Sequence, residues 1–262
     1  MSKTKAKIAS VSYLNSVQFI HGLQSSNLID AELTLATPVE CSQMLRSGDV
    51  DIALVPVGAL DTLEADGVDF EIVTSHCIGA IGSVRTVVML SDEEPQKIQR
   101  IWLDPHSQSS VKLLAHLCEH HFKISPKWLI LNDMSRVEHP QDGDAFLLIG
   151  DKVFDHEGIF EYSYDLAEEW QRLTTLPFVF AVWCARSGDN GVSEETIEEL
   201  EEALTWGVER TFEALQELRP EFEMEDGYRY LTESIDTLFD SEKREALRLF
   251  RASKSRITLS KE

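Results

Sequence analysis

Short apolar runs alternate with amphipathic stretches over the first 90 residues of the chain. The apolar runs have the length and residue types of buried strands and lie at residues 7–11, 32–35, 51–55 and 84–90. Apolar residues at helical spacing predict two helices between these strands, at residues 15–23 and 38–46. Repeated strand–helix–strand order of this kind predicts an α/β unit whose sheet is largely parallel.

A second α/β pattern starts after the polar segment at residues 91–95. Its predicted elements are a helix and three strands, at residues 109–122, 101–103, 128–131 and 145–149. One more buried strand is predicted at 178–183. From Ser193 onward the periodicity is helical, with Ser193 as an N-cap followed by Glu194 and Glu195 in the first turn, where acidic side chains are favourable.

This order of elements predicts a hinged, two-lobe α/β binding protein. The first lobe is expected to combine residues 1–90 and 178–262, including the C-terminal helices, and the second to contain residues 91–177. The strands at 84–90 and 178–183 are then the two connections between the lobes. In such a protein the ligand is expected in the cleft between the lobes.

The composition narrows the range of ligands. The 262 residues contain 46 acidic and 24 basic side chains, a formal net charge of −22, with 43% hydrophobic residues. A chain of this length buries a core without metal or disulfide support. The negative field argues against nucleic acid as a partner. Any anionic small molecule must therefore be held by local hydrogen-bond donors.

Several features predict a cytoplasmic protein with no membrane partner. No apolar run approaches the ~20 residues that span a bilayer. The basic start resembles that of a signal peptide, but polar residues at positions 10, 12, 15 and 18 interrupt the apolar region that should follow. The cysteines are isolated, as expected of reduced thiols: Cys41, Cys77, Cys118 and Cys184.

Polar residues directly follow the first predicted strand. Ser12 and Asn15 stand where the strand gives way to a helix, a position at which backbone N–H groups and short side chains can meet a ligand. Asn15 is equally suited to capping the helix, because Asn is strongly preferred there. The two roles are compatible.

A second polar loop precedes the predicted helix at 109–122. Ser107, Ser109 and Ser110 place three hydroxyls beside the unpaired amides of a helix N-terminus, an arrangement that suits a carboxylate or phosphate. Serine-rich starts also occur in helices that bind nothing, because serine caps helices well.

Arg85 and Thr86 belong to the predicted strand at 84–90. A guanidinium can bind a carboxylate through two hydrogen bonds, which makes Arg85 a candidate. Side chains alternate along a strand, so the two residues should face opposite ways. Of the two, Thr86 is preferred as the ligand-facing residue.

His116 and His120 are four residues apart, a spacing found among helical metal ligands. Neither an H-E-x-x-H nor a C-x-x-C motif accompanies them, so a solvated helix face is the favoured interpretation. The chain also has no G-x-G-x-x-G, Walker A or G-x-S-x-G motif. No metal and no cofactor is therefore predicted.

Taken together, these segments resemble the chorismate dehydratases of the futalosine route to menaquinone, over nearly the full chain. The six matching stretches, in order, are residues 11–15 together with 22–23, then 48–57, 84–87, 107–111, 148–151 and 176–183. None of these motifs is specific alone, but six in the right order are.

The resemblance implies a type II periplasmic-binding-protein-like fold and a lyase that converts chorismate to 3-[(1-carboxyvinyl)oxy]benzoate and water without a cofactor. It implies Asn15 and Thr86 as catalytic residues, with Ser83 as the alternative bearer of the active hydroxyl. The substrate-binding residues it implies are Ser12, Pro56, Ser83, Ser107, Ser109, Ser110, Gly150 and Asp151.

Two other functions share these features. A non-catalytic protein of the same fold that binds a small carboxylate would have the same architecture. A sister enzyme of the same pathway, acting on cyclic dehypoxanthine futalosine, is the second alternative, although the Ser-Tyr-Leu-Asn segment fits the dehydratase better.

Overall fold

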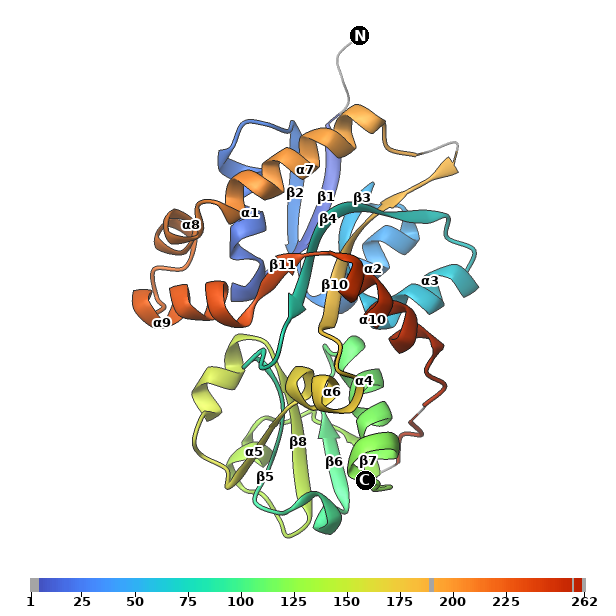
Figure 1. The fold of residues 1–262 in the computed structure, drawn as a ribbon, viewed down its shortest axis with the longest axis vertical. Coiled ribbons are helices and arrows are strands. Elements are labelled where there is room, and N and C mark those ends of the chain that lie inside the picture. The colour runs from blue at the N-terminus through green and yellow to red at the C-terminus, as the bar shows by residue number, and fades with distance from the viewer. Residues whose placement is uncertain (1–4, 189–190, 256, 261–262) are drawn as a thin grey trace. The chain divides into compact units, whose positions relative to one another are not determined.

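A computed structural model describes residues 5–188, 191–255 and 257–260 of the chain. The described residues form two compact units (Figure 1). Unit 1 contains the chain up to Gly79 and from Val179 to Ser241, and unit 2 contains Ala80 to Phe178 and the chain from Glu242 onward. No described helix is both long enough and apolar enough to cross a membrane.

Unit 1 is built on one mixed sheet. Its described strands, in spatial order, are β11 (Asp236–Leu238), β4 (Phe70–Ala80), β10 (Phe178–Arg186), β3 (Ile52–Pro56), β1 (Ala6–Val11) and β2 (Ala31–Ala36). Strand β1 is parallel to both β2 and β3, as the strand–helix–strand pattern predicts. Strands β10 and β11 run antiparallel to β3 and β4, so the sheet is less parallel than expected.

The described helices of unit 1 are α1 (Val17–Ser25), α2 (Pro38–Ser47), α3 (Leu60–Ala65), α7 (Glu194–Val208), α8 (Thr211–Leu218) and α9 (Met224–Arg229). Figure 1 shows α1 and α7 side by side. Helix α2 begins with a capping box, in which Thr37 accepts a hydrogen bond from the Glu40 amide and Glu40 accepts one from the Thr37 amide. Ser193 caps α7 through the Thr196 amide, which confirms its predicted role.

Unit 2 contains the second sheet. Its described strands, in spatial order, are β7 (Lys127–Ile130), β6 (Arg100–Leu103), β8 (Asp144–Ile149), β5 (Val87–Ser91) and β9 (Tyr162–Asp165). Strand β6 is parallel to β7 and β8, whereas β5 is antiparallel to β8 and β9. The described helices are α4 (Ser109–Leu117), α5 (Ser135–Glu138), α6 (Leu166–Thr174) and α10 (Ser241–Ala252). Residues 118–122 continue α4 as a π-helical turn, so the helix predicted at 109–122 is helical to its end.

The division into units differs from the predicted one at both ends of unit 2. Residues 80–90 were expected in the first lobe, but β5 pairs with β8 and β9 in the second sheet. Residues 242–262 were also expected in the first lobe, yet α10 packs on unit 2. The Phe250 ring of α10 lies edge-on to Phe178 and Trp170, with ring centroids 5.1 and 6.2 Å apart.

Replacing Phe250 with leucine is expected to destabilise unit 2 by about 1–2 kcal/mol, because the ring contacts to Trp170 and Phe178 are lost. Urea unfolding should report the loss. Amide hydrogen exchange should place it in β5 and β8 rather than in β1 and β3. Unchanged stability, or faster exchange confined to unit 1, would contradict the assignment of α10 to unit 2.

All four cysteines lie in the described part of the chain, where they are buried and form no disulfide. Burial raises the pKa of both the Cys41 and the Cys118 thiols to about 12. The thiolate is the reactive form of cysteine, so these two residues are chemically quiet at neutral pH.

Candidate functional site

The site residues predicted in unit 1 lie at one edge of its sheet, where β1 and β3 end. Strands β1 and β3 are parallel, and Ala9 of β1 pairs with Ala53 of β3. Their carboxyl ends therefore meet at the same edge. Ser12, which follows β1, and Pro56, which ends β3, both lie there. Ser12 is exposed and Pro56 is buried.

Asn15 lies in the short 3₁₀ turn η1 (Leu14–Ser16) that joins β1 to α1. Ser16, not Asn15, stands at the N-cap of α1, and no side chain caps that helix. The Ser16 hydroxyl oxygen lies 2.6 Å from the Val11 carbonyl oxygen and 3.0 Å from that of Tyr13, which ties the turn to the strand end. The structure therefore does not support capping as the role of Asn15.

The Asn15 side chain is half-buried at this edge. Its Oδ1 atom lies 3.4 Å from the Ser16 hydroxyl oxygen, a long contact for a hydrogen bond between oxygens. A side-chain amide held by so weak an internal contact is suited to hydrogen bonding with a ligand.

In unit 2, the predicted residues of three separate segments come together at one sheet edge. The carboxyl ends of the parallel strands β6 and β8 meet there, and the antiparallel pairing of Val87 with Ile149 brings the start of β5 to the same place. The Gly150 amide donates a hydrogen bond to the Thr86 carbonyl oxygen over 2.9 Å. The predicted residues at this edge are Ser83, Thr86, Ser107, Ser109, Ser110, Gly150 and Asp151.

Residues 84–86 form a tight turn, not the start of a strand as predicted. Arg85 has a φ of +62°, and the Thr86 amide donates to the Val84 carbonyl oxygen over 2.8 Å, closing a three-residue turn. Strand β5 begins only at Val87. The alternation argument that separated Arg85 from Thr86 therefore fails here, because alternation holds only in extended backbone.

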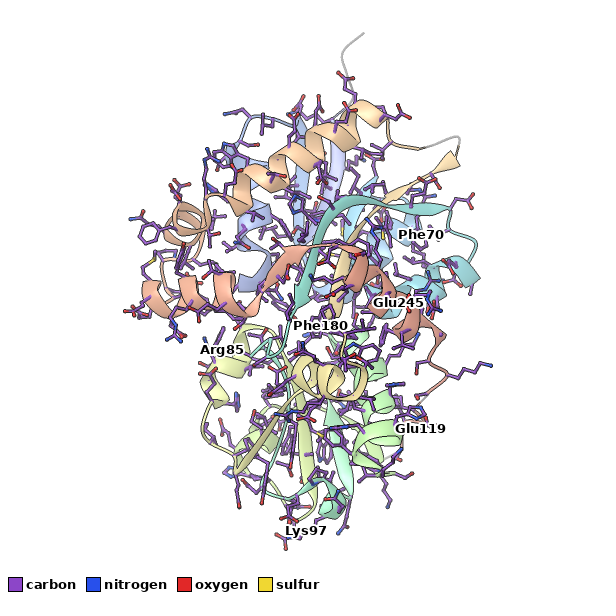
Figure 2. All side chains as sticks on the ribbon, in the orientation of Figure 1. Phe70, Arg85, Lys97, Glu119, Phe180 and Glu245 are labelled. Carbon is purple, nitrogen blue, oxygen red and sulfur yellow. The ribbon has the colours of Figure 1, made fainter. Side chains whose placement is uncertain are left out.

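The Arg85 side chain contacts neighbouring residues of unit 2. Its Nη2 atom lies 3.0 Å from Oε1 of Glu157, and its guanidinium lies 5.2 Å from the centre of the Phe154 ring. Figure 2 shows Arg85 on the loop before β5. These contacts, and not strand alternation, are the reason against Arg85 as a ligand-binding residue.

The two candidate hydroxyls of this turn have different surroundings. Ser83 donates a hydrogen bond from its hydroxyl to Oδ2 of Asp165 over 2.8 Å. Thr86 is 1% exposed, and its Oγ1 atom lies 3.4 Å from the Val84 carbonyl oxygen, too long for a strong hydrogen bond. The Ser83 hydroxyl is thus bound to Asp165, whereas the Thr86 hydroxyl is buried within the turn.

The serine-rich loop leads into α4, as predicted. Ser109 and Ser110 are the first two residues of that helix and are buried, while Gln108 occupies the N-cap without a capping side-chain hydrogen bond. The Ser107 hydroxyl is buried and has no hydrogen-bond partner among the described residues. The helix start therefore offers backbone N–H groups and a hydroxyl to an anion.

An ion pair between a buried carboxylate and a partly exposed lysine at the same edge was not predicted. Asp104, which follows β6, lies 2.5 Å from Nζ of Lys152 and accepts a hydrogen bond from the His106 amide over 3.0 Å. Lys152 adds a partly exposed cation directly after Gly150 and Asp151. The pair depends on β6 and β8 being spatial neighbours. That adjacency has no local signal in the sequence, because β7 intervenes along the chain.

Asp165 is a further residue that sequence reasoning missed. Its Oδ1 atom accepts hydrogen bonds from the Ala167 and Glu168 amides and so caps α6, while its Oδ2 atom accepts from the Ser83 hydroxyl and the Arg85 amide. Burial raises the pKa of Asp165, and the hydrogen bonds oppose this shift. The cap has a local signal, an Asp followed by acidic residues in the first turn.

The histidines of the 116–121 segment are engaged with protein groups. His116 lies 2.8 Å from the Ser253 hydroxyl, and His121 lies 2.6 Å from a carboxylate oxygen of Glu169. His120 is exposed, as expected of a solvated helix face, but His116 and His121 are half-buried. Within the described part of the chain, no three His, Cys, Asp or Glu side chains are grouped as metal ligands.

Several solved structures have a fold similar to that of this chain. The chain is similar to protein AF1704 from Archaeoglobus fulgidus, with a TM-score of 0.74 and 15% identity over 96% of this chain and 97% of that one. It also resembles the Candida albicans CA3427 gene product, which has the generic periplasmic binding protein fold (TM-score 0.59, 13% identity, 97% and 92% covered). A third similar structure is the periplasmic aliphatic sulphonate binding protein SsuA from Escherichia coli, with a TM-score of 0.60 and 15% identity over 95% of this chain and 92% of that one. The fold is thus periplasmic-binding-protein-like.

The family of the chain is shown by a match to its sequence. A sequence model described as menaquinone biosynthesis matches residues 6–255. The chain therefore belongs to the menaquinone biosynthesis family, in agreement with the resemblance drawn from its motifs.

Proposed function

We propose that this protein is a chorismate dehydratase, which converts chorismate to 3-[(1-carboxyvinyl)oxy]benzoate and water in menaquinone biosynthesis. The observation that carries the proposal is the match of the menaquinone biosynthesis family to residues 6–255. The polar residues at the two sheet edges support it, because amides, hydroxyls and helix N–H groups suit a substrate with two carboxylates.

The reaction is an elimination that makes the ring aromatic. A base removes the proton at C3 of chorismate, the electron pair forms the new ring double bond, and the C4–oxygen bond breaks. The departing hydroxide takes up a proton and leaves as water. Because aromatisation drives the reaction, the protein mainly has to select this outcome over other reactions of chorismate, and positioning can do that.

In this proposal the catalytic groups are Asn15 and Thr86. They orient the substrate and hydrogen-bond the leaving hydroxyl. A carboxylate of the substrate itself is assigned the proton at C3.

The remaining site residues are assigned to substrate binding. Ser12 and Pro56 belong to the unit 1 edge. At the unit 2 edge, the start of α4 binds a carboxylate through its amides, and Lys152 adds a positive charge. The other residues assigned to binding there are Ser83, Ser107, Ser109, Ser110, Gly150 and Asp151.

The test is to incubate the purified protein separately with chorismate and with cyclic dehypoxanthine futalosine and to follow both by mass spectrometry. The proposal predicts that chorismate alone is consumed, with loss of one water. Consumption of the futalosine derivative instead would identify the sister enzyme. Saturable binding of chorismate without turnover would identify a binding protein of the same fold.

Salt is expected to leave kcat/KM for chorismate level or to raise it. With a formal net charge of −22, the long-range field repels a dianion, and salt screens that field over a Debye length of ~8–10 Å. Short contacts at the start of α4 are screened much less. The measurement is kcat/KM over a sodium chloride series at fixed pH. A steep fall, with the circular dichroism spectrum unchanged, would point to capture by a concentrated positive patch.

A further inference from the structure

We infer that Asp165 is a positioning residue for the reaction, which holds the turn at residues 83–86 so that the Thr86 hydroxyl is correctly placed. The inference rests on the proposed function, because it assigns Asp165 a role in chorismate turnover. Asp165 ends β9 and is 7% exposed.

The two oxygens of Asp165 serve two different segments. Oδ1 accepts from the amides of Ala167 and Glu168, at 3.0 and 3.2 Å, and so caps α6. Oδ2 accepts from the Arg85 amide at 2.7 Å and the Ser83 hydroxyl at 2.8 Å, about eighty residues earlier in the chain. One buried carboxylate therefore fastens the turn to the start of a helix.

The turn needs such a fastening because its backbone is strained. Arg85 adopts the left-handed region with φ of +62°, which is costly for a residue with a side chain. Strain of this kind persists only where neighbouring groups enforce it. The hydrogen bond from the Arg85 amide to Asp165 holds the strained residue directly, and Thr86 is the next residue along the chain.

The turn is fixed from its other end by the second sheet. The Gly150 amide donates to the Thr86 carbonyl oxygen, and Val87 then enters the ladder with Ile149. Thr86 is thus anchored on its C-terminal side by β8 and on its N-terminal side by Asp165. Loss of the Asp165 anchor should let the hydroxyl move while the strand stays in place.

Asp165→Asn separates the two roles of the carboxylate. The amide can keep one oxygen toward Ala167 and Glu168, since Asn is a good helix cap, but its NH₂ group cannot accept from the Arg85 amide. Glu223→Gln is the matched control, because Glu223 caps α9 through the Asp226 amide, in unit 1 and outside both sheet edges. Thermal unfolding is measured for both variants, so that all rates refer to folded protein.

The decisive experiment is a double-mutant cycle with Thr86→Val, which removes the hydroxyl and keeps the branched shape. If Asp165 acts by placing Thr86, Asp165→Asn should lower kcat for chorismate by roughly tenfold or more in the wild-type background. In the Thr86→Val background it should lower kcat by less than about twofold, because nothing is left to position. Glu223→Gln should leave kcat unchanged.

The outcomes separate this inference from the proposed function. Suppose that the wild-type protein turns over chorismate. If Asp165→Asn then has the same effect on kcat in both backgrounds, or no effect in either, the positioning role alone is overturned. A wild-type protein that does not turn over chorismate would overturn both. Should Asp165→Asn fail to fold, Asp165→Ser applies the test in the same cycle, because serine keeps a helix-capping oxygen and has no second oxygen for the Arg85 amide. Its predicted effect is again confined to the background that retains Thr86.

Discussion

Replacing Asn15 with alanine is expected to reduce kcat/KM for chorismate by about 10²–10³-fold, the loss seen when a donor aimed at developing charge is removed. The fold should survive, because Asn15 is only half-buried and its side-chain oxygen makes a long 3.4 Å contact to the Ser16 hydroxyl. The effect should therefore appear in turnover and not in the temperature of unfolding.

Gln24→Ala is the matched control for this variant. Gln24 is an exposed residue in the last turn of α1, at the opposite end of that helix from Asn15, so a side-chain amide is removed away from both sheet edges. Steady-state kinetics and thermal unfolding should be measured on both proteins. If Asn15→Ala retained wild-type kcat/KM, Asn15 would have no place in the site.

The largest loss of stability is expected from a methyl group at the crossing of α1 and α7. A Cβ atom on Gly22 would lie 2.0 Å from the Ala203 carbonyl oxygen, and one on Gly207 would lie 2.0 Å from that of Gln18. Both obstacles are backbone atoms, so the helices themselves must separate. Gly22→Ala is expected to lower the free energy of unfolding by about 3 kcal/mol or more, even though alanine is the better helix former.

A graded control is provided by Gly227 in α9. There the nearest atom to an added Cβ is a methyl carbon of Leu215, at 2.9 Å, and a side-chain end can move aside. Gly227→Ala should therefore cost clearly less than Gly22→Ala in the same urea titration. Equal stability of Gly22→Ala and wild type would show that the two helices are not in backbone contact.

Local pattern predicted much of the fold because many strands are short, apolar and buried. The runs at 51–55 and 178–183 became β3 and β10, both buried along most of their length. Strand β4 was missed, because Glu71, Thr74 and His76 interrupt its apolar residues and give neither a continuous run nor a clean alternation. The unit boundary was misplaced for the same reason, since the chain leaves unit 1 at the end of β4.

The sequence alone was enough to propose the residues of the candidate site, but not the hydrogen bonds that join those residues to distant segments. Hydroxyl and amide residues next to strand ends pointed to both edges. The turn at 84–86 was read as a strand, because the left-handed φ of Arg85 has no glycine to signal it. The bonds from Asp165 to Ser83 and Arg85 join distant segments, and only the strand order of the second sheet brings them together.

The structure of the reaction product tests the proposed dehydratase activity most directly. Chorismate is incubated with the wild-type protein until it is consumed, and the product is identified by proton and carbon NMR. The account predicts a benzoate ring that carries an intact enolpyruvyl ether at position 3 and no hydroxyl at position 4. A ring that keeps the 4-hydroxyl and has lost the enolpyruvyl group, a rearranged non-aromatic product, or unchanged chorismate would contradict it.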